Sequence, residues 1–92
     1  MGKVSITLYG ILAKITGEKT AELEAPTLKE AMSTLAAKYG EQFRSKIYDE
    51  RGNVRRFVNI YVNGKDMRFL RQLDTELNDK DKISIIPAVG GG

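Results

Sequence analysis

The chain has 92 residues, of which 41% are apolar and 29% charged, and its formal net charge is +3. This length suits one small domain with a single core, and the composition is typical of a folded, water-soluble protein. The sequence contains no cysteine and no histidine, which excludes disulfides, zinc–thiolate sites, histidine-based triads and a cysteine nucleophile. The small positive excess does not by itself indicate nucleic-acid binding.

The first residues do not read as a signal peptide, and no apolar run is long enough to span a membrane. Met1-Gly2 would fit the start of a myristoylation motif, but Ile6 stands where that motif requires serine or threonine. We therefore expect a cytoplasmic protein with no membrane partner.

Alternating apolar and polar residues predict two strands in the first part of the chain, at residues 3–9 and 20–25. Residues 10–17 are predicted to form the turn of a hairpin between them. The side chains expected to face inward are Val4, Ile6, Leu8, Ala21 and Leu23.

A helix is predicted to start after Thr27, the expected N-cap, because Glu30 follows three residues later and completes a capping box. Gly40 is placed to end this helix. The apolar residues at helical spacing, which we expect to face the core, are Leu28, Ala31, Met32, Leu35, Ala36 and Tyr39.

The charged stretch 41–56 is predicted to be a partly ordered loop with at most a short helical turn. A strong strand follows at residues 57–62, and Asn63-Gly64 is the best hairpin turn in the sequence because both residues tolerate positive φ. The inward side chains expected here are Val58, Ile60 and Val62.

Residues 65–68 are predicted to return as a short strand, and residues 71–82 to form a loop with a turn near Asn78-Asp79. The last strand is expected at residues 82–86, with Ile83 and Ile85 inward. A turn, rather than a metal site, is the simpler account of Asp79 and Asp81.

Two hairpins flanking one helix predict an α+β fold, with one main helix packed on one face of a mixed four- to five-stranded sheet. We expect residues 1–86 to form this domain and residues 87–92 to form a flexible glycine tail.

Four blocks of sequence carry a resemblance to the β-grasp fold of ubiquitin-like proteins. They are Arg-Phe-Val-Asn-Ile-Tyr-Val-Asn at 56–63, Asp-Met-Arg-Phe at 66–69, Leu-Asp-Thr at 73–75, and Ile-Ile-Pro-Ala-Val at 85–89 before the closing glycines. Within that fold the chain resembles the MoaD/ThiS sulfur-carrier family, especially the cysteine-synthesis sulfur carriers and the archaeal ubiquitin-like small modifiers. It departs from many relatives at residues 11–14, which lack their arginine, at Lys80, which replaces a glycine, and at the additional Gly90.

The resemblance implies that the α-carboxylate of Gly92 is the reactive group. An E1-like enzyme would adenylate it with ATP and Mg, and sulfide from a persulfide donor would displace AMP to leave a thiocarboxylate. Gly90 and Gly91 would let the tail thread into the partner's active site, because glycine has no Cβ and adopts any φ and ψ. The chain itself would bind no cofactor or metal and would contain no catalytic residue.

The resemblance leaves several functions open. A sulfur carrier would serve a sulfur-acceptor enzyme, either the large subunit of a molybdopterin-synthase-like complex or a cysteine-synthase-like enzyme, in the biosynthesis of cysteine, molybdopterin or thiamine or in tRNA thiolation. A ubiquitin-like modifier would instead join Gly92 to lysines of target proteins. A non-covalent β-grasp binding module is the third possibility. Terminal glycines can also be frayed ends with no role, but Pro-Ala-Val before them and the β-grasp order of elements favour a functional tail.

Four large side chains are expected on the outward face of the sheet by the two-residue period of strands: Tyr9, Phe57, Tyr61 and Ile86. Such a patch often marks a partner surface, and we expect it to dock the activating enzyme and the acceptor. The alternative is that Phe57 and Tyr61 pack against residues 41–56. A basic-rich region is read as solvated surface, with nucleic acid an improbable partner; it contains Lys38, Arg44, Lys46, Arg51, Arg55 and Arg56.

Overall fold

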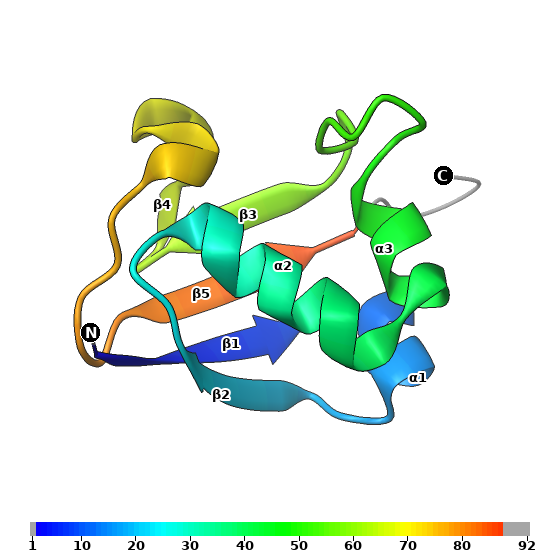
Figure 1. Ribbon diagram of the computed structural model, residues 1–92, viewed down its shortest axis with the longest axis horizontal. Coiled ribbons are helices and arrows are strands. Elements are labelled where there is room, and N and C mark those ends of the chain that lie inside the picture. Colours follow the sequence, from blue (N-terminus) through cyan, green and yellow to red (C-terminus); the bar gives the residue numbers. More distant parts are fainter. Residues whose placement is uncertain (1, 88–92) are drawn as a thin grey trace.

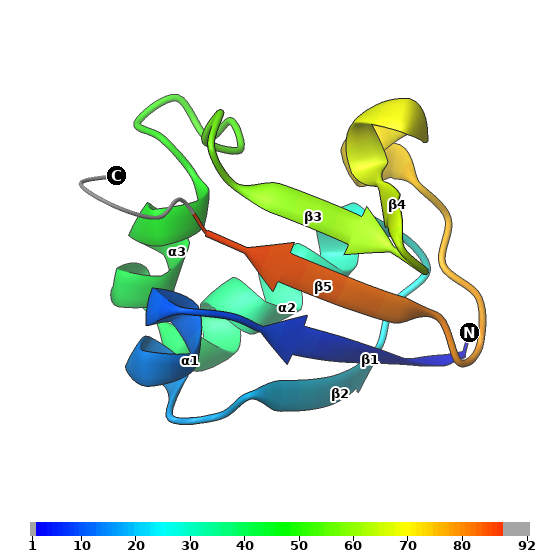
Figure 2. The same cartoon turned by 180° about the vertical axis from the view of Figure 1, so that it is seen from behind.

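A computed structural model describes residues 2–87 and contains a five-stranded sheet with a helical layer on one face (Figure 1). The helix α2 (Leu28–Tyr39) crosses the sheet, and two shorter helices, α1 (Ile11–Thr16) and α3 (Glu41–Ile47), lie at one end of it. The opposite face of the sheet carries no helix within the described residues (Figure 2). This arrangement confirms the predicted α+β fold with one main helix on one face.

The strands β1 (Lys3–Leu8), β2 (Thr20–Glu24), β3 (Asn59–Val62), β4 (Lys65–Asp66) and β5 (Lys82–Ile86) lie in the order β2-β1-β5-β3-β4. The central pair, β1 and β5, is parallel, whereas the other pairs are antiparallel. The sheet is therefore mixed, as predicted. Because β5 runs parallel to β1 in the middle of the sheet, the chain leaves the domain at the end where β1 meets α1.

The predicted inward residues form the core. Val4, Ile6, Leu8, Ala21, Val58, Ile60, Val62, Ile83 and Ile85 are all buried. Leu23 is half-buried against them, and α2 adds Leu28, Ala31, Met32 and Leu35 to the same cluster. Met32 is thus a core residue, as expected. The apolar faces of the strands and of α2 pack against each other in one interface. Burial of this interface is the main favourable contribution to the free energy of folding.

The predicted ends of α2 are confirmed. Thr27 is the N-cap, and its hydroxyl oxygen accepts a hydrogen bond of 3.4 Å from the amide of Glu30. Gly40 ends the helix with φ 86°, a value that favours glycine, and its amide donates to the carbonyl of Ala36.

Two predictions about the connecting segments were wrong. Within the predicted turn, Ile11–Thr16 form the helix α1, and within the predicted loop 41–56, Glu41–Ile47 form α3, a longer helix than the short helical turn expected there. Neither helix has a side-chain N-cap, and both are too short to be stable alone. They form because Leu12 on α1, and Phe43 with Ile47 on α3, are fully buried in the core.

The second hairpin turns at Asn63-Gly64, as predicted, with φ values of 53° and 83°. Its strands are shorter than expected. β3 begins at Asn59, because the amide of Val58 bonds back to the carbonyl of Arg55 in a turn. After Asp66 the chain enters the 3₁₀ helix η1 (Met67–Phe69), and a second one, η2 (Gln72–Asp74), interrupts the predicted loop 71–82.

The turn before β5 is confirmed near Asn78-Asp79 and is closed by side chains. The Asp81 carboxylate accepts bonds from the amide of Asn78 and the side chain of Asn63, and Asp79 accepts from the amide of Lys3. Lys80 has φ 72°, a strained value for a side chain with a Cβ. These hydrogen bonds occupy both carboxylates and support the interpretation of the segment as a turn.

Candidate functional site at the root of the tail

The root of the tail is Pro87, which follows β5 directly and is buried. It lies beside Gly10, where β1 passes into α1, because a Cβ added to Gly10 would be 3.4 Å from the Pro87 ring. Gly10 has φ 56° and ψ −130°, a combination that is essentially limited to glycine. Gly92, the predicted reactive residue, lies outside the described residues, as do Gly90 and Gly91, which are predicted to let the tail thread into a partner.

The structure brings three of the four predicted surface residues onto the open face of the sheet. Tyr61 on β3 and Ile86 on β5 are diagonal neighbours, because Asn59 pairs with Ile86 and Tyr61 pairs with Ser84. Tyr9 follows the Leu8–Ile85 pair, and its amide donates to the carbonyl of Ile85. Tyr61 on β3, Ile86 on β5 and Tyr9, which directly follows β1, are therefore grouped near Pro87 and are called the open-face trio.

Phe57 lies apart from the open-face trio. It precedes β3 in the turn of residues 55–58 and lines a groove with Ser45 and Lys46 of α3. Its side chain is nevertheless 66% exposed. Phe57 therefore neither lies on the open face of the sheet nor is buried against α3. The prediction that it faces outward from the sheet and the alternative that it packs against residues 41–56 each describe its environment only in part.

Arg68 holds this turn in place, a role that the sequence analysis did not assign. Its guanidinium donates to the carbonyls of Arg56 and Val58, at 2.8 Å and 3.1 Å, and to the side chain of Asn59, at 3.2 Å. It also lies 3.7 Å from the carboxylate of Asp66. A fork of donors of this kind suits arginine alone among the side chains. The signal was its position inside the conspicuous Asp-Met-Arg-Phe block at 66–69.

We expect Arg68→Ala to lower the free energy of unfolding by about 1–2 kcal/mol, since several charge-assisted bonds are lost from a partly exposed site. Amide hydrogen exchange should accelerate between residues 55 and 59. Arg71→Ala is the matched control, because the described residues make no hydrogen bond or ion pair with the Arg71 side chain. Equal urea midpoints for the two variants would contradict this role.

Two tyrosines of the helical layer have shifted acidity. Burial raises the pKa of Tyr39, and its hydrogen bond to the Glu18 carboxylate raises it further. Burial also raises the pKa of Tyr48, although Arg44 partly opposes the shift. Both phenols therefore stay protonated at neutral pH and serve in packing. No group of three acidic, cysteine or histidine side chains is gathered for a metal within residues 2–87.

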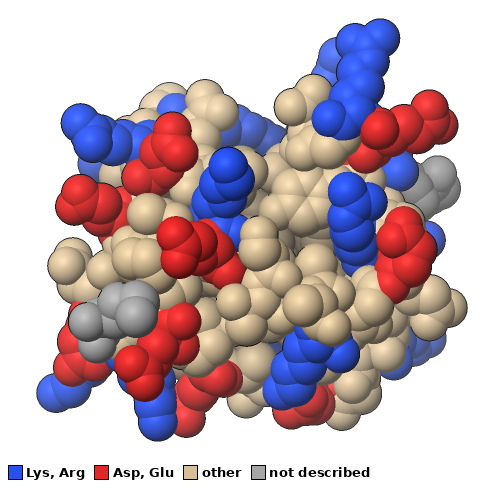
Figure 3. Space-filling model, viewed as in Figure 1, with Lys and Arg blue, Asp and Glu red and all other residues tan. Residues whose placement is uncertain are grey.

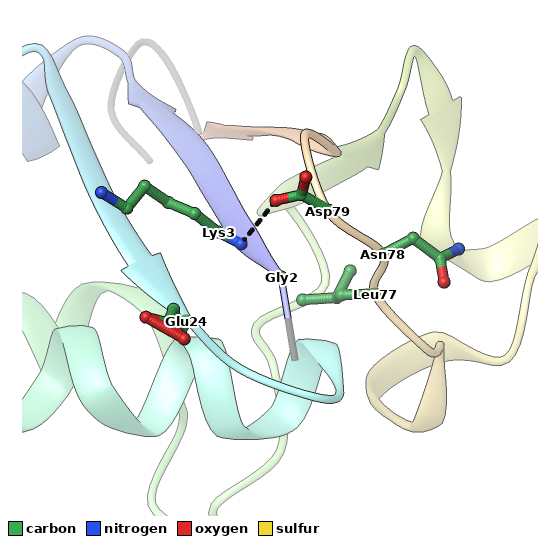
Figure 4. Close-up of a pocket in the computed structure, with 6 residues that line it drawn as sticks. All are labelled: Gly2, Lys3, Glu24, Leu77, Asn78 and Asp79. Carbon is green, nitrogen blue, oxygen red and sulfur yellow. Dashed lines mark hydrogen bonds between the residues drawn. The ribbon is translucent and has the colours of Figure 1, made fainter.

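A pocket separate from the groove at Phe57 lies at the end of the sheet opposite Pro87 (Figure 4). Gly2, Lys3, Glu24, Leu77, Asn78 and Asp79 line it. Figure 4 shows the amide of Lys3 donating to Asp79, so this pocket is the outer side of the contact that joins β1 to the turn before β5. We assign it a structural role.

Positive and negative side chains are interspersed over the helical face (Figure 3). Lys38 lies near Glu18, and Arg44 near Glu41, each with N–O distances of 3.8 Å. This mixed charge agrees with the expected solvated surface. None of the helices within residues 2–87 is long and apolar enough to cross a membrane.

The mixed sheet, the helix α2 across one face and a central last strand that continues into a C-terminal tail define the β-grasp class of ubiquitin-like proteins. Comparison with known proteins is specific about the family. The chain matches the ThiS family over residues 6–92 and belongs to it.

Individual relatives cover almost the whole chain. It is 40% identical over 91 residues to the sulfur carrier protein CysO of Mycobacterium tuberculosis, covering 97% of this chain and 98% of that protein. The solution structure of small archaeal modifier protein 1 from Methanosarcina acetivorans superposes with a TM-score of 0.87 at 30% identity, covering 100% and 98% of the two chains. The crystal structure of the Amycolatopsis orientalis BexX/CysO complex gives a TM-score of 0.81 at 33% identity, covering 97% and 99%. These matches confirm the resemblance to sulfur carriers and to archaeal small modifiers.

Proposed function

We propose that this chain is a sulfur carrier that works through the carboxylate of Gly92. An E1-like enzyme would use ATP and Mg to join this carboxylate to AMP, with release of pyrophosphate. The outer sulfur of a persulfide donor would then attack the acyl-adenylate carbonyl and displace AMP, and a second thiol would cleave the resulting acyl disulfide, forming a disulfide and leaving a C-terminal thiocarboxylate. The chain supplies the reacting group, and the catalytic residues belong to its partner enzymes, including the acceptor that takes the sulfur.

The observation that carries this proposal is the family match, which extends to Gly92 itself. The 40% identical relative named as a sulfur carrier supports it over nearly the full length. The fold supports it, because the central strand β5 ends at Ile86 and the buried Pro87 follows, so the glycine-ended segment starts at one end of the sheet. Glycine suits an adenylation channel since it adds no Cβ to the threaded backbone.

Conjugation to proteins is the second candidate, favoured by the similarity to the archaeal modifier at 30% identity. In that case the activated carbonyl of Gly92 would be attacked by a lysine amine, forming an isopeptide bond with release of AMP or a thiol. Both functions use the same activation and differ only in the acceptor.

Intact mass spectrometry of the protein isolated from its native host tests the proposal. A carrier should show a fraction heavier by the difference between sulfur and oxygen, and alkylation of the thiocarboxylate should shift this fraction further by the mass of the added alkyl group. A modifier should leave residues 83–92 on target lysines after trypsin, which cuts behind Lys82. Finding neither product under sulfur limitation and under oxidative growth would refute the proposal.

Charge on the open-face trio is expected to prevent activation. Tyr61→Glu and Ile86→Glu place a carboxylate among side chains that we propose to dock the activating enzyme, so ATP–pyrophosphate exchange should fall by at least about tenfold. Both side chains are only half-buried, and the fold should therefore persist.

Ala37→Glu is the control, because Ala37 is exposed on α2, which lies on the opposite side of the sheet from the open face. It should leave the exchange rate unchanged. Normal exchange with a folded Tyr61→Glu protein would show that the open face is not the docking surface.

A further inference from the structure

A groove of about 880 Å³ opens beside the root of the tail. The helix α3 forms one wall and the turn of residues 55–58 forms the other, while Ile11 of α1 and the buried Pro87 also line it. It differs from the open face of the sheet, which holds Tyr9, Tyr61 and Ile86. We define this space as the tail-root groove.

The tail-root groove exposes two large apolar side chains. Phe57 is 66% exposed and Ile11 is 42% exposed, whereas nearby Val58 and Pro87 are buried. Neither exposed residue is needed to complete the core. Large apolar groups held at a surface in this way are characteristic of contact sites.

The tail-root groove also carries a positive charge. Lys46, Arg55 and Arg56 line it, and the ion pairs of the described residues involve other cations: Lys38, Arg44 and Arg68. Asp49 is the single acidic residue of the lining, and its carboxylate already accepts the amides of Arg51 and Asn53.

One of the three cations, the Arg55 guanidinium, is held in place by the protein itself. The Nε of Arg55 donates to the carbonyl of Ser45 at 2.8 Å, and its amide donates to the carbonyl of Ile47. The carbonyl of Arg56 accepts a hydrogen bond from the Arg68 guanidinium, which fixes the backbone of the turn that carries the Arg56 side chain. A preformed positive site loses less side-chain entropy on binding a carboxylate.

The tail-root groove lies at Pro87, a short distance along the chain from the proposed reactive carboxylate of Gly92. Five residues separate Pro87 from the Gly92 carboxylate, which can reach at most about 17 Å. An enzyme that adenylates Gly92 must therefore bring its own surface close to Pro87 and to the groove.

We propose that the tail-root groove binds an acidic segment of the enzyme that activates Gly92, with Lys46, Arg55 and Arg56 pairing its carboxylates and with Phe57 and Ile11 holding one apolar anchor residue. This inference rests on the proposed function. A single aromatic residue and a largely apolar lining fit a peptide better than a nucleic-acid backbone, which would need a longer basic track. Charge complementarity of this kind raises the association rate and fixes orientation.

The test compares two double variants of equal charge change. The groove variant, Lys46→Glu with Arg56→Glu, reverses the charge of two cations in the tail-root groove. The control variant, Lys19→Glu with Lys65→Glu, reverses the charge of two exposed cations outside the groove. The activating enzyme is purified from the host by the ATP–pyrophosphate exchange that the wild-type chain elicits. The groove variant should raise KM for the chain by at least about tenfold with kcat retained, and the wild-type KM should rise with salt.

Each outcome is decisive. Unchanged KM for the groove variant, or an equal rise for the control variant, would overturn the inference. Loss of binding to bulk transfer RNA from the host, with KM unchanged, would assign the groove to RNA and overturn it as well. Absence of exchange with the wild-type chain would instead refute the proposed function. Urea midpoints confirm that both variants are folded.

Discussion

Deletion of Gly92 is expected to abolish thiocarboxylate formation without changing the fold. The buried cluster that stabilises the domain lies between Val4 and Ile85, so removing the last residue costs the core nothing. The chemistry, by contrast, requires the carboxylate to arrive at the α-phosphate of ATP in the correct position. Displacement of a reacting group by one residue, about 3.5 Å, removes the advantage of a positioned reaction.

Intact mass spectrometry of the host-expressed variant measures the effect, with circular dichroism as the check on folding. Lys65→Ala is the control, because Lys65 is exposed on β4 at the end of the sheet opposite Pro87. It should form thiocarboxylate at the wild-type level. A thiocarboxylate on the chain that ends at Gly91 would contradict the assignment of the chemistry to Gly92.

Phe43→Ala should produce the largest loss of stability of any single substitution considered. Phe43 is fully buried on α3, and its ring lies 5.6 Å from that of Tyr39 on α2. Truncation leaves a cavity that the packed helices cannot fill, at a cost of about 3–5 kcal/mol. A domain of this kind has a total stability of roughly 5–15 kcal/mol, so the variant should be close to unfolding at physiological temperature.

Equilibrium denaturation in urea measures this effect, and Gln42→Ala is its control because the neighbouring side chain is exposed on the same helix. The control should retain the wild-type midpoint. A loss below about 1 kcal/mol for Phe43→Ala would show that α3 is not part of the cooperative core. Because Ser45 and Lys46 of α3 also line the tail-root groove, partial unfolding of α3 would remove that groove.

The open-face trio and the tail-root groove are two separate surfaces near Pro87 that are proposed to bind the activating enzyme. The open-face trio is uncharged and lies on the sheet, whereas the tail-root groove is positive and lies between α3 and the turn of residues 55–58. A partner that binds both surfaces would contact the domain on two sides of Pro87. Arg68 connects them, since it bonds to Asn59 on β3 and to Arg56 beside the groove.

The sequence alone determined the elements that have strong local signals. The alternation of Val4, Ile6 and Leu8 predicts β1, Thr27 and Gly40 mark the ends of α2, and Asn63-Gly64 marks the hairpin. Each of these signals depends on neighbours within a few residues, where side-chain period and backbone preference dominate. The family resemblance, and with it the proposed chemistry of the tail, also follows from the sequence.

The tertiary structure decided what depends on distant contacts. α1 and α3 lack side-chain caps and are stable only through burial of Leu12 and Phe43, so local reasoning described them as a turn and a loop. Phe57 follows the strand period in the sequence, but its place in a charged groove depends on Arg68 and α3, which come from other parts of the chain. The same reason applies to Pro87: its burial beside Gly10 is a contact across 77 positions, and it determines where the sequence leaves the described domain.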